Sequence, residues 1–168
     1  YVEGTVEQFK EEHPEIFSTR GATKGELKAD YKLAQQICEY IDSNERIQAY
    51  LSGEKQTILT GNIGGVPFKI KMDSYIKDRA IVDLKVMATL RDSQGNFKDF
   101  IGQYGYDIQL ACYQEVEYQN SGKRLPCYIV AVSKENPIDS VIIHVPQVYL
   151  DMALAKVEED IVHLLSNK

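Results

Sequence analysis

The most informative part of the sequence is a pair of short stretches, Phe68-Lys69-Ile70-Lys71-Met72-Asp73 and, after a turn, Ile81-Val82-Asp83-Leu84-Lys85. Both are rich in apolar residues and contain charged residues at alternating positions, which is typical of strands. A strand repeats its side-chain direction every two residues, so Asp83 and Lys85 project from the same face. If the two strands pair, Asp73 comes to lie beside them. The stretch therefore predicts two carboxylates and an ammonium group at one point of a sheet.

Two carboxylates beside a fixed positive charge can bind a divalent metal ion, and such a site can hydrolyse phosphodiesters. An Asp and a Lys inside an apolar strand are costly to bury unless they are paired or bind a metal. Two alternatives therefore remain, a buried ion pair between Asp83 and Lys85, or a strand end exposed to water. They are the safer interpretation of the spacing by itself, because Asp-x-Lys is a weak pattern.

A third acidic residue precedes the first of these strands. Glu54, in Gly53-Glu54-Lys55-Gln56, lies at the start of a predicted hairpin and can supply another ligand to the same site. The alternative is a solvated loop glutamate, and Gln56 is the neighbouring candidate for the same place.

A polar and aromatic stripe follows the second strand. Gln109 and Tyr113 are four residues apart on a predicted helix, hence on one face, and Tyr106 lies one turn earlier on that face. Such a stripe can hydrogen-bond a phosphate or stack on a base. The alternative is an aromatic stripe that packs on the sheet.

Patterns along the chain predict an α/β fold. Helical periodicity before residue 54 gives way to a hairpin with Gly64-Gly65 at its turn, and a long helix is predicted over residues 97–120. The remaining elements are strands at 79–87, 126–133 and 140–144 and a helix after Pro146. We expect one domain over residues 1–168, with a central mixed sheet of about five strands flanked by helices.

Composition narrows the class of protein. The chain has 168 residues and a net charge of −6, which argues mildly against a large nucleic-acid surface without excluding one. The three cysteines lack a Cys-x-x-Cys pattern, so we expect reduced, buried side chains, and the three histidines lack metal-ligand spacing. No apolar run is long enough to span a membrane. The first residue is Tyr1 rather than Met, so we expect the natural protein to begin further upstream.

The order of Glu54, Asp73, Asp83-x-Lys85 and Gln109-xxx-Tyr113 resembles that of the PD-(D/E)XK nuclease superfamily. The Gln-xxx-Tyr motif is similar to that of the RecB-like branch, and within it to phage recombination exonucleases of the RecE (exonuclease VIII) type. The similarity covers most of the chain and implies a restriction-endonuclease-like core. Met72 stands where the superfamily motif has Pro, a substitution that the superfamily tolerates.

The resemblance implies a role for each matching residue. Asp73 and Asp83 would bind Mg²⁺ or Mn²⁺, together with the backbone carbonyl of Leu84 and, directly or through water, Glu54. Lys85 would position or activate the attacking water. The remaining matches, expected to contact DNA, are Gln109, Tyr113 and Tyr106.

The same resemblance implies a function. It is that of a Mg²⁺-dependent exonuclease that degrades double-stranded DNA ends, 5′ to 3′, and leaves single strands for an annealing protein during phage-type recombination. A ring-like homo-oligomer and a cytoplasmic location in a bacterium, without membrane association, are expected. The resemblance also implies further helices upstream of the point where this chain begins, which would form part of the DNA entrance.

Three other functions stay open at this stage. The first is a nuclease fold that no longer cuts and instead binds DNA ends or a protein partner. The second is another RecB-like nuclease. A CRISPR-associated nuclease of this branch would require four cysteines to bind an iron–sulfur cluster, and the three cysteines of this chain argue against it. The third is a purely structural ion pair in an inactive domain.

Overall fold

The computed structural model describes residues 6–167, with side chains from Phe9 onward, and it forms two compact units, residues 1–43 and 44–168. The predicted single domain over 1–168 stays a prediction. In the first unit, the elements are α1 (Val6–Glu12), η1 (Pro14–Ile16), η2 (Gly21–Thr23) and α2 (Ala29–Ser43). A bridge between Phe17 and Leu27 closes the loop that contains η2.

The second unit contains a five-stranded mixed sheet in the order β1-β2-β3-β4-β5. Its strands are β1 (Glu54–Ile63), β2 (Val66–Ile76), β3 (Ala80–Met87), β4 (Cys127–Ser133) and β5 (Ser140–Val145). Neighbouring strands are antiparallel except β3 and β4, which are parallel. The predicted mixed sheet is thereby confirmed.

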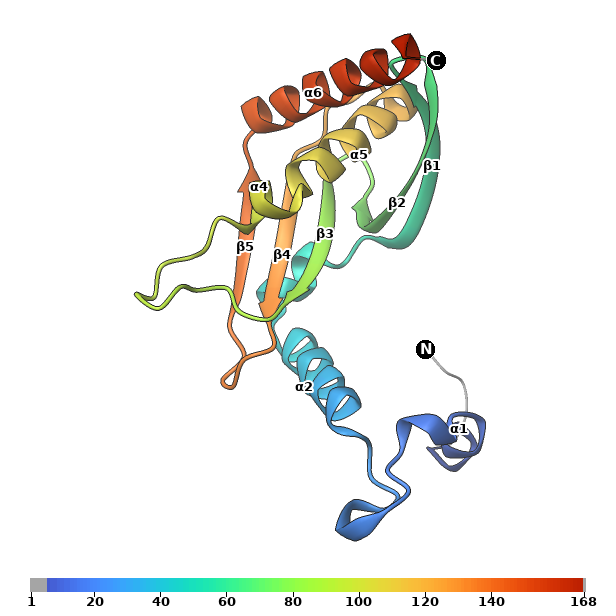
Figure 1. Ribbon diagram of the computed structural model, residues 1–168, viewed down its shortest axis with the longest axis vertical. Coiled ribbons are helices and arrows are strands. Elements are labelled where there is room, and N and C mark those ends of the chain that lie inside the picture. Colours follow the sequence, from blue (N-terminus) through green and yellow to red (C-terminus); the bar gives the residue numbers. More distant parts are fainter. Residues whose placement is uncertain (1–5, 168) are drawn as a thin grey trace. The chain divides into compact units, whose positions relative to one another are not determined.

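Four helices belong to the second unit: α3 (Glu45–Tyr50), α4 (Phe100–Tyr104), α5 (Tyr106–Ser121) and α6 (Gln147–Ser166). Because parallel strands need a long crossover, the segment with α4 and α5 connects β3 to β4. Helix α5 packs on the sheet and beside α6 (Figure 1). The core lies between α5 and the sheet, where Leu110, Val116, Ile81 and Ile129 are fully buried.

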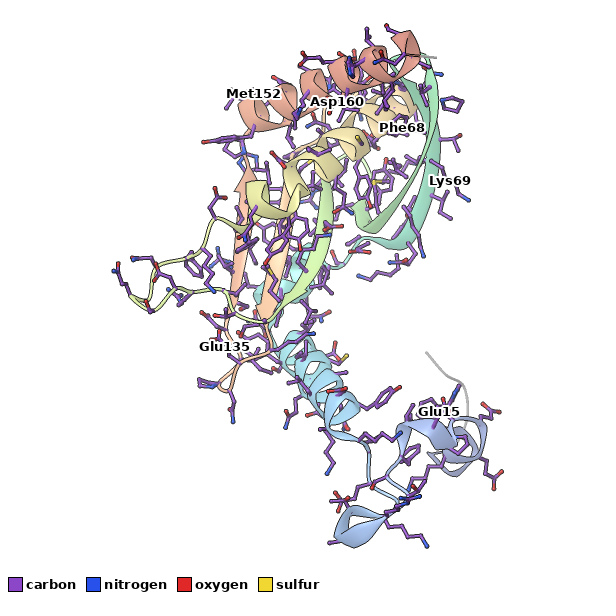
Figure 2. The ribbon with its side chains drawn as sticks, in the orientation of Figure 1. Glu15, Phe68, Lys69, Glu135, Met152 and Asp160 are labelled. Carbon is purple, nitrogen blue, oxygen red and sulfur yellow. The ribbon has the colours of Figure 1, made fainter. Side chains whose placement is uncertain are left out.

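The β1–β2 hairpin follows its sequence pattern. Gly64 and Gly65 both have positive φ, 57° and 81°, as a tight two-residue hairpin turn requires. Along β2, Lys69 is exposed while the adjacent Phe68 packs against the core (Figure 2). This alternation matches the alternating charged positions of residues 68–73 in the sequence.

The single helix predicted over residues 97–120 is wrong, because the structure has two helices that meet at Gly105. Gly105 adopts a left-handed conformation, with φ 67°, and its N–H donates to the carbonyls of Ile101 and Gly102. Glycine reaches this conformation without the strain that a Cβ would cause. The break sets Tyr104 and Tyr106 on two separate helices.

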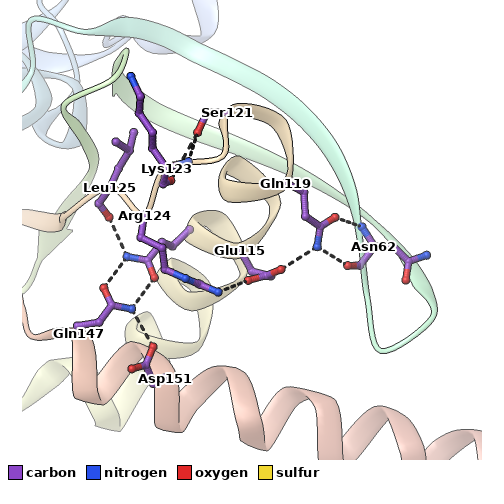
Figure 3. A network of polar contacts seen from close by, with 10 residues as sticks. Asn62, Glu115, Gln119, Ser121, Lys123, Arg124, Leu125, Gln147 and Asp151 are labelled. Atoms are coloured by element: carbon purple, nitrogen blue, oxygen red, sulfur yellow. Dashed lines mark hydrogen bonds and ion pairs between the residues drawn. The ribbon is translucent and has the colours of Figure 1, made fainter.

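Side-chain amides hold α5 to its neighbours (Figure 3). Gln119 accepts a hydrogen bond from Asn62 N (2.9 Å) and donates one to Asn62 O (2.7 Å), so it pairs with the edge strand β1 as another strand would. Gln114 and Gln147 exchange hydrogen bonds of 2.9 and 2.7 Å between α5 and α6. These contacts fix the helix that faces the candidate site.

No helix within residues 6–167 combines the length and apolarity needed to cross a membrane.

Replacing Gly53 by Ala tests the approach of β1 to β2. A Cβ at this position would lie 2.5 Å from the backbone C and O of Tyr75, so one strand must shift. We expect Gly53→Ala to lower the free energy of unfolding by about 2–3 kcal/mol, measured by urea denaturation. Gly102→Ala is the matched control, because its nearest atom is 4.0 Å away, and it should be neutral or slightly stabilising. Equal stability of the two variants would contradict the packing described.

Candidate active site at the separation of β2 and β3

Strands β2 and β3 pair over only a short length. Their register pairs within the described residues are Ser74–Val82, Tyr75–Ile81 and Ile76–Ala80. Backbone pairing stops at Ser74. The next inward-facing N–H of β3, that of Leu84, donates instead to the side-chain Oδ2 of Asp73, at 3.1 Å. The strands therefore separate at Asp73, and its carboxylate spans the gap between them.

The carbonyl of Leu84 points into the same gap. In an extended strand, the N–H and C=O of one residue point to the same side. Because the N–H of Leu84 faces Asp73, its carbonyl oxygen also faces the β2 side. The gap thus contains one backbone oxygen and one carboxylate.

Asp83 adds a second carboxylate, which is only 2% exposed. Its Oδ2 forms an ion pair with Lys85 Nζ at 2.7 Å, but no hydrogen bond of regular geometry reaches this buried oxygen from the described residues. Burial raises the pKa of Asp83, Lys85 opposes the shift, and the nearby Asp73 adds to it. The structure therefore contains the ion pair between Asp83 and Lys85 that the sequence left open. Within the described residues, Asp83 Oδ2 has this ion pair but no regular hydrogen bond.

These oxygen atoms fit a hard divalent cation. Two carboxylates and a carbonyl are the ligands that Mg²⁺ and Mn²⁺ prefer. A cation between them would also relieve the repulsion that disfavours two adjacent negative charges. Among the described residues, no group of three or more His, Cys, Asp or Glu side chains surrounds the point, so Glu54 does not join Asp73 and Asp83 in an acidic cluster.

Lys85 is held from three sides. Besides Asp83, its ammonium donates to Gln109 Oε1 at 2.8 Å and lies 4.4 Å from the centroid of the Tyr106 ring. Gln109 Nε2 in turn donates to the Tyr113 hydroxyl at 2.7 Å. The structure therefore brings the predicted stripe of α5 onto the Asp-x-Lys strand.

Gln56, rather than Glu54, contacts the site. Gln56 Nε2 donates to Asp73 Oδ1 at 2.9 Å, and the residue has a φ of 56°, which is strained for a side chain other than glycine. Glu54 is exposed and pairs in register with Tyr75, two residues beyond Asp73. A strained residue that touches a candidate ligand is a feature found at functional sites.

One polar pair close to the site was missed by the sequence analysis. Glu117, fully buried on α5, accepts a hydrogen bond from the Tyr75 hydroxyl at 2.9 Å, while its Oε2 has no partner among the described residues. Glu117 continues the stripe of Gln109 and Tyr113 by another four residues, and this spacing was the available signal. The pair ties β2 to α5 two residues after Asp73.

The cysteines are free thiols, as predicted. Cys127 is buried, and burial raises its pKa to about 12. The prediction of burial is wrong for Cys38, which is exposed on α2, and Cys112 is only half-buried.

A mixed sheet with an Asp…Asp-x-Lys site at its opening defines a restriction-endonuclease-like α/β fold of the PD-(D/E)XK class. Over residues 1–168 the chain matches a family described as "PDDEXK-like domain of unknown function (DUF3799)", and it belongs to that family.

A crystal structure of a proposed exonuclease from Eubacterium rectale is similar. The two chains are 46% identical with a TM-score of 0.81, over 97% of this chain and 61% of the other. This chain therefore spans about three fifths of that protein. A second structure, SSO0001, is 15% identical over 79% of this chain and 60% of its own, with a TM-score of 0.41. None of the curated proteins searched matches the chain.

The Tyr75–Glu117 pair predicts a pH-dependent stability. Burial, and then the Glu117 carboxylate, raise the pKa of Tyr75 to about 12. Above the ordinary value of about 10, the unfolded chain releases this proton while the folded chain keeps it, so stability falls as the pH rises towards 12. Tyr75→Phe lacks the proton and leaves Glu117 unpaired, and it should cost about 1–3 kcal/mol at pH 8.

The advantage of the wild type over Tyr75→Phe should therefore shrink between pH 10 and pH 12. Urea unfolding at pH 8, 10 and 11 measures this difference, with Tyr118→Phe as the control, because Tyr118 is an exposed tyrosine next to Glu117 on α5. A difference that stays constant over the whole range would rule out the proposed linkage.

Proposed function

We propose that this chain is the catalytic part of a metal-dependent DNA exonuclease. The observation that carries the proposal is the meeting of Asp73, Asp83 and Lys85 where β2 and β3 separate, with Leu84 N bound to one of the carboxylates. Membership of the PDDEXK-like family and the similarity to a proposed exonuclease support it.

The proposed metal ligands are the carboxylates of Asp73 and Asp83 and the carbonyl of Leu84. A Mg²⁺ or Mn²⁺ ion held there would supply Lewis acidity, activating water for attack and stabilising the leaving 3′-oxygen. Asp73 is oriented for this task by the hydrogen bonds from Leu84 N and Gln56. Asp83 is kept in place by burial and by Lys85.

Lys85 places a fixed positive charge beside the scissile phosphate. Its ammonium is only partly exposed, with 18% of the side chain accessible, so its field is less weakened by water than that of a surface lysine. Gln109 Oε1 accepts a hydrogen bond from the ammonium and so holds it in position. Lys85 would orient the attacking water and stabilise the charge that develops on the phosphate.

Tyr113 and Tyr106 extend the site towards DNA. A tyrosine hydroxyl, with an ordinary pKa of about 10, is protonated at neutral pH, and burial raises the pKa of Tyr113 further, so its hydroxyl can donate to a phosphate oxygen. The hydroxyl already accepts from Gln109, which leaves its own proton available. Tyr106 lies under Lys85 and can pack against the sugar or base next to the scissile bond.

The finer assignments are also part of the proposal. The resemblance to RecE-type enzymes supports 5′-to-3′ degradation of double-stranded ends in phage-type recombination, a single-strand annealing protein as partner, a ring-like homo-oligomer and a cytoplasmic location. A digestion assay with one labelled 5′ end and one labelled 3′ end, with Mg²⁺ and with chelator, tests polarity and metal dependence together.

Removing the charged groups should abolish activity. Lys85→Ala alone would leave Asp83 buried without its partner and could unfold the chain, so Asp83→Asn and the neutral double variant Asp83→Asn/Lys85→Met are better tests. Both should lower the rate of Mg²⁺-dependent degradation by roughly a thousandfold or more while the fold, followed by circular dichroism, is kept.

Asp78→Asn is the matched control, because it removes an exposed carboxylate whose partner is the surface residue Lys123. It should degrade DNA at the wild-type rate. Full activity in Asp83→Asn would overturn the catalytic assignment, and a wild type that binds DNA ends without cutting them would favour a binding module instead.

A metal titration separates Gln56 from Glu54, the two candidates upstream of the hairpin. Gln56 touches Asp73 whereas Glu54 lies outside the acidic pair, so Gln56→Ala should weaken Mn²⁺ binding by roughly tenfold and by more than Glu54→Gln does. Isothermal titration calorimetry measures both affinities, with Asp73→Asn as the variant that should lose binding. If Glu54→Gln has the larger effect, Glu54 is the ligand that the resemblance implies.

A further inference from the structure

Tyr104 is an exposed aromatic residue at the edge of the candidate site. It is the last residue of α4, and 57% of it is accessible. Its ring stacks on that of Tyr106, with the centroids 5.7 Å apart and the planes at 29°. The left-handed Gly105 between them turns the chain so that residues two apart can stack in this way.

The stack begins in the core and ends in solvent. Phe100, only 1% exposed, meets Tyr106 edge-on with a centroid distance of 6.5 Å. Lys85 Nζ lies 4.4 Å from the centre of the same Tyr106 ring. Tyr106 is therefore fixed by the core and by the candidate catalytic lysine, and Tyr104 is the outermost ring of an ordered series.

Core packing does not account for the position of Tyr104. An aromatic ring contributes most to stability when both of its faces are buried, and a ring this exposed leaves much of its apolar surface in water. A flat ring held against a second one is already ordered, so a further flat group can stack on it at little entropic cost.

We propose that Tyr104 is a stacking platform for an unpaired nucleobase of the DNA end. The inference rests on the proposed function, because it takes the scissile phosphate to lie at Lys85. A base on the outer side of Tyr104 would then belong to a nucleotide near that phosphate, because Tyr106 contacts both Tyr104 and Lys85. Every base has a π-face, so the subsite accepts any sequence.

The platform selects a class of substrate. A base inside a duplex is already stacked on its neighbours, whereas a base of a frayed or single-stranded end has a free face. Tyr104 therefore favours DNA ends whose terminal nucleotides are unpaired. The hydroxyl plays no part in such stacking, so Phe should replace Tyr without loss.

The test is DNA binding followed by the fluorescence of 2-aminopurine placed in a two-nucleotide unpaired end. Chelator is present, so binding is measured apart from cleavage. Wild type and Tyr104→Phe should quench the fluorescence, because stacking quenches this base analogue. Tyr104→Leu should lose the quenching and bind the unpaired end roughly tenfold or more weakly, with little change for a blunt duplex.

Tyr118→Leu is the matched control. Tyr118 is another partly exposed tyrosine, 39% accessible, with Arg124 over its ring. It lies about 18 Å along α5 from Tyr106, so it should not affect quenching or affinity. Loss of quenching in Tyr118→Leu as large as in Tyr104→Leu would show a general effect and overturn the subsite.

The outcomes separate the two proposals. If the wild type cuts DNA but Tyr104→Leu keeps wild-type quenching and affinity, the subsite is wrong and the nuclease proposal stands. The same holds if Tyr104→Leu changes only the oligomeric state, because the ring then contacts another copy of the chain. A wild type that neither binds nor cuts DNA overturns both.

Discussion

The hydrogen bond from Leu84 N to Asp73 Oδ2 is the interaction on which the candidate site depends. In the interior of a sheet, each backbone N–H normally donates to a carbonyl of a neighbouring strand, and a buried N–H without an acceptor is costly. Here a carboxylate replaces the strand, so β2 can leave β3 without that cost. The same bond holds Asp73 opposite the buried Asp83 and turns the Leu84 carbonyl towards them. One hydrogen bond therefore both allows the strands to separate and positions the oxygen atoms that could bind a metal ion.

The second layer of the site is a single face of α5. Gln109 accepts a hydrogen bond from Lys85 and donates one to Tyr113, and Glu117, one turn further, accepts one from Tyr75 next to the strand separation. Glu117 is buried, and its Oε2, like Oδ2 of the buried Asp83, has no hydrogen-bond partner within residues 6–167. Such incomplete satisfaction reduces stability and is typical of sites that await a ligand. The side-chain amides of Gln114 and Gln119 hold α5 to α6 and to β1, respectively.

Local periodicity made much of this predictable from the sequence. Alternation placed Asp83 and Lys85 on one face, the Gly64-Gly65 pair marked the hairpin, and the four-residue spacing of Gln109 and Tyr113 put them together. The break at Gly105 was missed because helical periodicity continues across it. The contacts of Gln56 and Glu117 depend on register between distant segments, which a pattern in one segment does not contain. For the same reason, the sequence could not show whether Gln56 or Glu54 contacts Asp73.

We propose that the separation of β2 and β3 is the binding site for a catalytic divalent cation. Anomalous diffraction from a crystal of the protein soaked in Mn²⁺ tests it most directly, because it locates the ion without any assumption about activity. We expect a peak about 2 Å from oxygens of Asp73 and Asp83 and from the Leu84 carbonyl. A fully soaked crystal with no peak there, or with its only peak away from both carboxylates, would contradict it.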